Sequence, residues 1–177
     1  MIDLKNRKCS LSECRQYRWI LEFEISNNQK ELIFIGLNPS LSDNKFTDNT
    51  TKKIIKISSF HKYGKIRIIN LFALISKKPE NLKIHKDPIG FYNNQLIKSC
   101  LIDWSENIDC DLWLGWGNRG KLFSRDKEVL NTIAKYKDLK KKRFLDSYNP
   151  LIIKKTKYNN PFHPLYCLDN STFIKYT

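Results

Sequence analysis

The sequence lacks most of the patterns that would assign it to a well-known enzyme class. It contains neither the H-x-E and P-C-x-x-C motifs of zinc deaminases nor the G-x-S-x-G turn of serine hydrolases. Histidine is scarce, with three residues at positions 61, 85 and 163. The longest apolar runs, such as LIFIGL and LWLGW, are too short to cross a bilayer. These absences exclude several common catalytic designs and predict no contact with a membrane.

Cysteine is present, but its spacing predicts no cross-link. The five cysteines at positions 9, 14, 100, 110 and 167 are an odd number and form no C-x-x-C pair. The interval between Cys9 and Cys14 is not typical of a zinc site. We therefore expect reduced, mostly buried thiols and neither a metal nor a cofactor. The polar start MIDLKNRKCS has no apolar signal core, which favours a cytoplasmic protein.

The charge balance is strongly positive. The 177 residues include 32 Lys and Arg against 18 Asp and Glu, a formal charge of +14. Such a field on a small domain favours a polyanionic partner, and nucleic acid is the first candidate. An alternative is compositional bias, because Lys, Asn and Ile are all abundant. The length fits one domain over residues 1–177, which we expect to be monomeric.

Apolar runs and helical segments alternate along the chain. Residues 14–25 read as an antiparallel strand, and apolar runs at 31–36, 65–74, 110–117 and 149–156 as further strands. Helices are expected over TTKKIIKISSFHKY, with Asp48 or Asn49 as its cap, and over about 91–107 and 118–136. The pattern predicts an α/β fold with three layers, α/β/α, around a central, mostly parallel four-stranded sheet. A short helix or tail would close the chain.

Unusual residues follow four of the predicted strands. They are Asn38-Pro39, Asn70-Leu71-Phe72, the segment Gly115 to Asn118, and His163-Pro164. In parallel sheets the ligand lies beyond the carboxyl ends of the strands. We therefore expect these four segments to meet in one cleft.

One segment resembles a phosphate-binding loop. GWGNRGKL has the spacing G-x-x-x-x-G-K and follows an apolar strand. The next residue is Leu122, where that motif needs Ser or Thr to hold magnesium. Trp116 and Arg119 would also crowd the loop. We interpret it as a strand-to-helix turn whose helix start could hold an anion such as a DNA phosphate.

The four strand ends together resemble the uracil-DNA glycosylase superfamily. LIFIGLNPSLSDNKF is similar to its first motif, and most similar to the mismatch-specific thymine/uracil branch, where a strand ends in Gly-x-Asn-Pro-Gly. INLFAL, LWLGWG and HPLY resemble the later motifs, in the same order, across about residues 14–168. The Asn-Pro-Ser and His-Pro-Leu-Tyr motifs also resemble those of a family of bacterial and viral proteins. Ser40 replaces the second glycine and HPLY lacks the following Ser-Pro, so we expect a reshaped pocket.

The resemblance implies roles for individual residues. Asn38 would position the attacking water and His163 would donate a hydrogen bond to the leaving base. The residues that would bind the base are Gly36, Pro39, Phe46 and Asn70. Those that would bind the DNA backbone are Ser40, Arg119, Lys121, Pro164 and Tyr166, with the basic run at 135–143.

The expected function is therefore that of a monofunctional DNA N-glycosylase. It would hydrolyse the bond to a damaged, mismatched or modified base that is flipped out of double-stranded DNA, leaving an abasic site. Base excision in DNA repair and antiviral defence against modified viral DNA both fit. The main alternative is a non-catalytic module on the same fold that binds nucleic acid or nucleotides. A hydrolase of free nucleosides is a further alternative.

Overall fold

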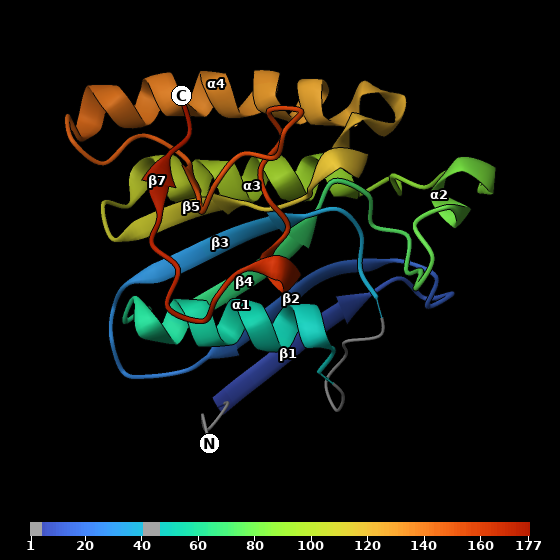
Figure 1. Cartoon of the computed structure of the whole chain (residues 1–177), viewed down its shortest axis with the longest axis horizontal. Helices are drawn as coiled ribbons and strands as arrows, with labels where there is room; N and C mark the ends of the chain where they lie inside the picture. Colours follow the sequence, from blue (N-terminus) through green and yellow to red (C-terminus); the bar gives the residue numbers. More distant parts are fainter. Residues whose placement is uncertain (1–4, 41–46) are drawn as a thin grey trace.

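The computed structural model describes residues 5–40 and 47–177, which form one mixed sheet and its covering helices (Figure 1). The strands are β1 (Lys5–Leu11), β2 (Arg18–Glu24), β3 (Glu31–Gly36), β4 (Lys65–Asn70), β5 (Cys110–Leu114), β6 (Leu151–Ile152) and β7 (Ile174–Lys175). The helices are α1 (Asn49–Phe60), α2 (Asn81–Ile84), α3 (Asn93–Glu106) and α4 (Arg125–Arg143). Short 3₁₀ helices span Asn118–Ser124 and Pro164–Tyr166.

The sheet is larger than the sequence predicts. Its strand order is β1-β2-β4-β3-β5-β6-β7, seven strands in the described residues rather than four. The central strands β4, β3, β5 and β6 are parallel, whereas β1, β2 and β7 join antiparallel. The α/β class is therefore right, and the four-stranded sheet is wrong. The predicted parallel strands form only the middle of a mixed sheet.

The strands that the sequence missed lie at or near the sheet edges. The β1 sequence KNRKCSL is mostly polar, and its pairing with β2 is interrupted by two register shifts. The two residues of β7 are both exposed. Edge strands need little burial and often carry lysine, so they give weak hydrophobic patterns. The strand predicted at 149–156 is shorter in the structure, where β6 spans only Leu151–Ile152.

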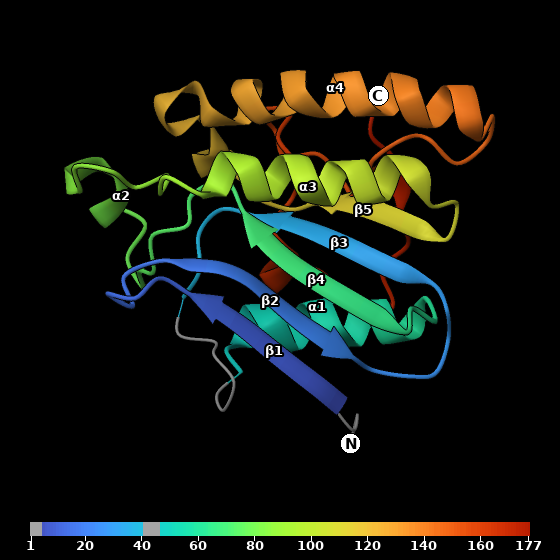
Figure 2. The ribbon, with the colours of Figure 1, turned by 180° about the vertical axis from the view of Figure 1, so that it is seen from behind.

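Helices cover both faces of the sheet (Figures 1 and 2). Along β3, Leu32 and Phe34 pack with the apolar residues of α1, while Ile33 and Ile35 pack with those of α3 and α4. All four side chains are buried. Burial on both faces explains why β3 shows no alternation of polar and apolar residues. The three-layer arrangement agrees with the expectation from the sequence.

The helix boundaries follow local capping. Asp48 accepts a hydrogen bond from the backbone N–H of Thr51 at 2.7 Å, so it is the N-cap of α1. The helix expected over 118–136 is instead a 3₁₀ segment followed by α4, which continues to Arg143. Phe123 and Ser124 have positive φ at this junction, which a sequence pattern of helix-compatible residues does not reveal.

The connections make the end of β3 a crossing point. The chain leaves β3 toward α1 on one face, but leaves β4 and β5 toward α3 and α4 on the other. Such a reversal opens a crevice beyond the strand ends, where α/β proteins bind ligands. The segment after β3 contains Asn38. In residues 5–40 and 47–177, no helix is both long enough and apolar enough to span a membrane.

Candidate functional site

The four segments singled out in the sequence meet at the carboxyl edge of the parallel strands. Three of them line a cleft of about 490 Å³, to which the loop after β4 adds Ser76, Lys77 and Pro79. The fourth reaches an adjoining recess through Asn70. The residues that line it are Leu37, Asn38, Ser40, Thr50, Ser76, Lys77, Pro79, Trp116, Gly117, Asn118, Arg119, His163, Leu165 and Tyr166. The convergence that the topology predicts is therefore present.

A smaller recess of about 50 Å³ adjoins the cleft. The two share Asn38, Ser40 and His163 in their walls. The recess reaches down to Gly36 at the end of β3 and Asn70 at the end of β4. It therefore places two asparagines and a histidine around one small, mostly enclosed volume.

Asn38 is held in a single orientation by its amide nitrogen. Its Nδ2 donates to the backbone carbonyls of Ser76 at 2.9 Å and Pro39 at 3.0 Å, with Leu74 at 3.5 Å. Because the nitrogen faces three carbonyls, the amide oxygen is turned away from them. This Oδ1 accepts no hydrogen bond from the described residues. Since Asn38 lines both cavities, its oxygen is left as a hydrogen-bond acceptor at their shared wall.

His163 is fixed as a neutral donor. Its Nδ1 accepts a hydrogen bond from the backbone N–H of Leu165 at 3.3 Å, which leaves the proton of the neutral ring on Nε2. Burial lowers the pKa of His163, and the negative charge of Asp48 opposes this only in part. The ring therefore stays uncharged at neutral pH. It can offer an N–H to a ligand without carrying a charge into the cavity.

The lowered pKa predicts a pH dependence of stability. The unfolded chain takes up a proton near the usual histidine pKa of about 6.5, whereas folded His163 does so only at lower pH. The stability that neutral His163 gives the fold is therefore fully present above the usual histidine pKa. This stability is lost as the pH falls from there toward the lower pKa of the folded state. We expect His163→Gln to lose less thermal stability than the wild type as the pH falls from roughly 7.5 to roughly 5, a range that spans the usual histidine pKa.

Thermal melts over this pH series test the prediction. A proton NMR titration supplies the assignment, because the histidine signal missing from His163→Gln is that of His163. Equal loss of stability in both proteins, or a signal that titrates above the usual histidine pKa, would contradict the prediction.

Asn70 is anchored from behind by α3 and α4. Its backbone carbonyl accepts a hydrogen bond from Asn93 Nδ2 at 3.1 Å, and the same nitrogen donates to the Leu71 carbonyl at 2.9 Å. Arg125 Nε also donates to Leu71, at 2.9 Å. Asn70 is 3% exposed, yet its Nδ2 has no hydrogen-bond partner in the described structure. A buried amide donor without a partner points to a ligand acceptor in the recess.

Gly36 gives the Asn70 side chain its space. A Cβ at position 36 would lie 2.8 Å from Asn70 Oδ1 and 2.9 Å from a ring carbon of Phe34. Both neighbours are buried, so one of them would have to shift. The glycine therefore sets the depth of the recess.

We expect Gly36→Ala to destabilise the fold by about 1–3 kcal/mol, because the added methyl overpacks this site. For a chain of this length the melting temperature should fall by roughly 2–12 °C. Thermal denaturation followed by circular dichroism measures this. A melting temperature unchanged within error would mean that Asn70 has another position available and that the recess is not tightly defined.

Ser40 and Pro39 shape the loop around Asn38. Ser40 lines both cavities, and its hydroxyl donates to the Asp48 carboxylate. Pro39 is buried and lines neither cavity; its carbonyl accepts from Asn38 Nδ2 and from the backbone N–H of Ser76. The structure therefore gives Pro39 a supporting position rather than the base contact that the sequence predicts.

The predicted backbone-binding residues divide into two groups. Arg119 and Tyr166 line the cleft, and Tyr166 is largely exposed, although Arg119 forms an ion pair with Glu80. Lys121 and Pro164 do not line it. The Lys121 ammonium lies 5.8 Å from the ring centre of Tyr158, and Pro164 is buried beside Gly115.

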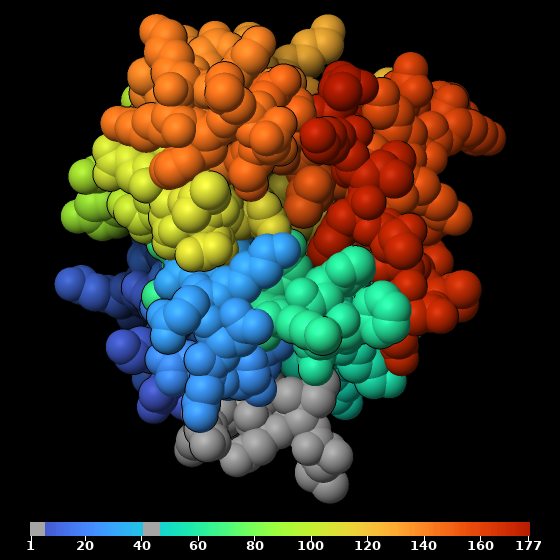
Figure 3. Space-filling model, turned by 90° about the vertical axis from the view of Figure 1, so that its left-hand side faces the viewer, coloured from blue at the N-terminus to red at the C-terminus, as the bar shows by residue number. Residues whose placement is uncertain are grey.

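The basic run at 135–143 does not reach the cleft. It forms the last turns of α4, and Lys140 donates to the carbonyl of Cys110, the first residue of β5. The cleft lies beyond the last residue of that strand. Figure 3 views the opposite edge and shows this part of α4 in orange above the turn before β5 in yellow. A contact between this run and DNA phosphates therefore stays a prediction, and it would lie at the opposite edge of the sheet from the cleft.

Two other expectations have different outcomes. Phe46, predicted to stack on the base, lies outside the described residues. The GWGNRGKL segment is no phosphate loop, because the Trp116 indole occupies the space beside Gly120, where a Cβ would be only 2.2 Å from it. No cluster of His, Cys, Asp or Glu that could hold a metal occurs among residues 5–40 and 47–177.

Sequence reasoning missed Arg18 and Ser76. Arg18 is 3% exposed and lines the recess, and its only signal was an arginine at the start of a strand whose residues alternate loosely between apolar and charged. Ser76 lines the cleft and its carbonyl orients Asn38, but the two residues are 38 positions apart. A contact with a backbone carbonyl does not depend on the residue type, so the sequence gives no signal for it.

Comparison with known proteins identifies the family. Neither the curated proteins nor the solved structures yield a significant match. The family DUF1643, described as a protein of unknown function, matches residues 18–165. The match begins at Arg18 on the recess and ends at Leu165, so it includes every residue that lines the two cavities except Tyr166. The chain belongs to the DUF1643 family.

Proposed function

We propose that this protein is a DNA glycosylase that hydrolyses the N-glycosidic bond of a flipped base. The orientation of Asn38 is the observation that carries the proposal. Its amide nitrogen is held by the carbonyls of Ser76 and Pro39, and the residue lines both cavities, so its oxygen is the group left to act as an acceptor there. Such an acceptor can hold a water molecule by one proton and direct its lone pair toward C1′ of the sugar.

The second half of the reaction concerns the leaving base. As the bond to C1′ breaks, the base takes up negative charge, and a preorganised donor stabilises that charge most effectively in a buried site. His163 offers its Nε2–H there as a neutral group. A neutral donor needs no counter-charge in the free enzyme, which agrees with the small number of carboxylates around the recess.

Recognition of the base falls to Asn70. Its Nδ2 is buried, lies in the recess wall and has no partner in the described residues. A carbonyl oxygen on the edge of the base would satisfy it. Because the recess lies behind the cleft, a base can reach it only after leaving the duplex, which costs least for a damaged, mismatched or modified base.

The proposal extends to the setting of the reaction. The formal charge of +14 supports double-stranded DNA as the partner, with cleft cations such as Lys77 near the phosphates. We place the protein in the cytoplasm as a monomer with the fold of a uracil-DNA glycosylase. Repair of cellular DNA and defence against modified viral DNA both remain compatible with the site.

Release of the base tests the proposal. Duplexes carrying uracil, mismatched thymine or modified cytosines, including glucosylated ones, are incubated with the protein and treated with alkali. We expect strand breaks at one class of base, since alkali cleaves abasic sites. Tight, salt-sensitive binding with no break on any duplex would instead identify a non-catalytic binding module.

A further inference from the structure

A second groove lies beside the candidate cleft. Its volume is about 760 Å³, and it is lined by Arg15, Gln16, Leu74, Ile75, Ser76, Asn81, Ile84, His85 and Lys86. Ser76 belongs to the walls of both the groove and the cleft. The groove runs between the β1–β2 turn and α2, which lie at the same end of the sheet in Figures 1 and 2. The groove and the cleft therefore adjoin at Ser76.

A cluster of aromatic rings flanks the groove. The rings of Tyr17 and Trp19 are stacked in parallel, 5.5 Å apart with an interplanar angle of 3°. Phe91 and Tyr92 meet Trp19 edge-on, at centroid distances of 6.2 Å and 5.6 Å. We call these four residues the aromatic cluster. The ring of His85, which lines the groove, lies edge-on to the ring of Tyr17, with the two ring centroids 6.0 Å apart. His85 therefore connects the aromatic cluster to the groove.

The aromatic cluster is built into the fold and yet exposed. Gly90, with φ of +81°, lies so close that a Cβ would be 2.9 Å from both Tyr17 and Trp19. The Tyr17 hydroxyl donates to the Asp87 carbonyl at 2.8 Å. These contacts fix the stacked pair in place, whereas Phe91 remains 77% and Tyr92 50% exposed. Large rings held rigidly at the surface indicate an interaction site.

The charge around the groove selects the partner. Arg15 and Lys86 lie in its wall, and Lys83 is exposed on α2, whose residues Asn81 and Ile84 also line the groove. The nearby Glu80 is engaged by Arg119. Cations beside exposed rings match the two parts of a nucleic-acid strand, since phosphates pair with the cations and unpaired bases stack on the rings. A paired duplex would hide the base faces.

We propose that this groove and the aromatic cluster bind single-stranded nucleic acid, at a site separate from the duplex proposed for the cleft. The surface holds unpaired bases on the aromatic rings and the backbone on Arg15 and Lys86. The proposal concerns binding alone and does not require the protein to cleave a glycosidic bond.

The intrinsic fluorescence of Trp19 provides a direct readout. The chain has four tryptophans, and Trp104, Trp113 and Trp116 are at most 1% exposed. Trp19 is half-buried within the aromatic cluster, so a base stacked on the cluster can quench its emission. We expect an oligothymidylate of about twelve nucleotides, a length within the usual site sizes, to quench the wild type. We expect the oligonucleotide to leave the emission of Trp19→Phe nearly unchanged.

Affinity measurements on surface variants complete the test. The double variant Phe91→Ala, Tyr92→Ala should bind the oligonucleotide at least about five-fold more weakly, because removing one base-stacking ring has an effect of this size or more. Phe60→Ala, an exposed aromatic substitution at the end of α1, is the matched control and should bind as the wild type does. Replacing Arg15 and Lys86 with Gln should lower the salt dependence, by about 0.7 in slope for each phosphate that the protein no longer neutralises.

Three results would overturn the proposal. The first is unaltered affinity of the double variant, and the second is unchanged Trp19 emission at saturation. The third is a wild type that is a dimer and a double variant that is a monomer, with equal affinity for the oligonucleotide. That result would mean that a second copy of the chain, and not nucleic acid, covers the aromatic cluster. These experiments measure binding and not base release. They therefore test the groove even if the protein proves not to be a glycosylase. Asn38→Ala should retain full quenching.

Discussion

Replacing Asn38 with alanine should reduce the rate of base release by about 100-fold or more, which is the usual effect of removing the group that positions or activates the attacking water. The substitution removes a side-chain oxygen that the loop after β3 fixes toward the cavity by tying the amide nitrogen to backbone carbonyls. Single-turnover kinetics on the duplex identified by the base-release assay measure the effect. DNA affinity should stay within a few-fold of the wild type, since Asn38 makes no phosphate contact in this account.

Asn118→Ala is the matched control for this experiment. Asn118 lines the same cleft, but its Oδ1 is occupied by the Thr156 hydroxyl at 2.6 Å and Asn160 Nδ2 at 3.2 Å. We expect its rate to remain within about three-fold of the wild type, because it has no role at the reacting bond. If the DNA affinity of Asn38→Ala falls by the same factor as its rate of base release, Asn38 is a binding contact and the proposed mechanism fails.

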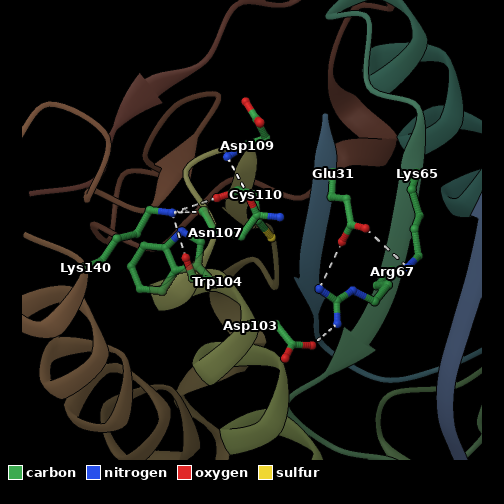
Figure 4. A network of polar contacts seen from close by, with 9 residues as sticks. All are labelled: Glu31, Lys65, Arg67, Asp103, Trp104, Asn107, Asp109, Cys110 and Lys140. Atoms are coloured by element: carbon green, nitrogen blue, oxygen red, sulfur yellow. Dashed lines mark hydrogen bonds and ion pairs between the residues drawn. The ribbon is translucent and has the colours of Figure 1, made fainter. Parts of the chain in front are cut away.

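Replacing Lys140 with methionine should lower the free energy of unfolding by about 2–5 kcal/mol, because it strips buried carbonyls of their donor. The Lys140 side chain is 0% exposed, and its Nζ donates to the carbonyls of Trp104 and Asn107 at 2.6 Å and of Cys110 at 3.0 Å. These carbonyls lie at the end of α3 and the start of β5 (Figure 4). Methionine keeps the apolar stem but donates nothing.

Urea denaturation of Lys140→Met and Lys142→Met tests this role. Lys142 is exposed two residues further along α4, so its replacement should change stability by less than about 0.5 kcal/mol. Equal effects of the two substitutions would mean that the α3 carbonyls find water instead. The result also bears on DNA binding, because a lysine buried in this way cannot contact a phosphate.

A second buried cation secures the same region of the fold. Arg67 on β4 pairs with Glu31 on β3 at 3.2 Å and with Asp103 on α3 (Figure 4). Together with Lys140 it joins α3 to the amino-terminal ends of the central strands. Both residues belong to the large positive count, yet neither is available to a partner. The positive charge available to a polyanionic partner is therefore smaller than the composition alone indicates.

The central strands could be predicted from the sequence because they are buried on both sides. β3, β4 and β5 are nearly continuous apolar runs. The structure matches the predicted bounds of β3 and ends β4 four residues and β5 three residues earlier than predicted. β1 and β7 escaped prediction because edge strands need few apolar residues. The helix expected to end near residue 136 continues to Arg143 because Lys140 packs inward. Hydrophobic patterns treat a lysine as solvent-exposed, so they do not predict that Lys140 is buried.

The candidate site was predictable as a place rather than as a set of contacts. Parallel strands bring their carboxyl ends together, so Asn38, Asn70 and His163 could be expected near one another. What fixes them could not: Asn38 depends on the Ser76 carbonyl, and Asn70 is anchored through Asn93 and Leu71. These are long-range contacts with backbone atoms. Lys121 failed as a cleft residue because the 3₁₀ turn at Asn118–Ser124 directs it toward Tyr158.

The mass of a single DNA strand after incubation tests the central claim most directly. Loss of one base and gain of one water should appear in the oligonucleotide that carries the substrate base, with the free base in solution and the strand otherwise intact. The change should be absent with Asn38→Ala. An unchanged mass for every modified duplex, under conditions where binding is complete, would contradict the assignment as a glycosylase.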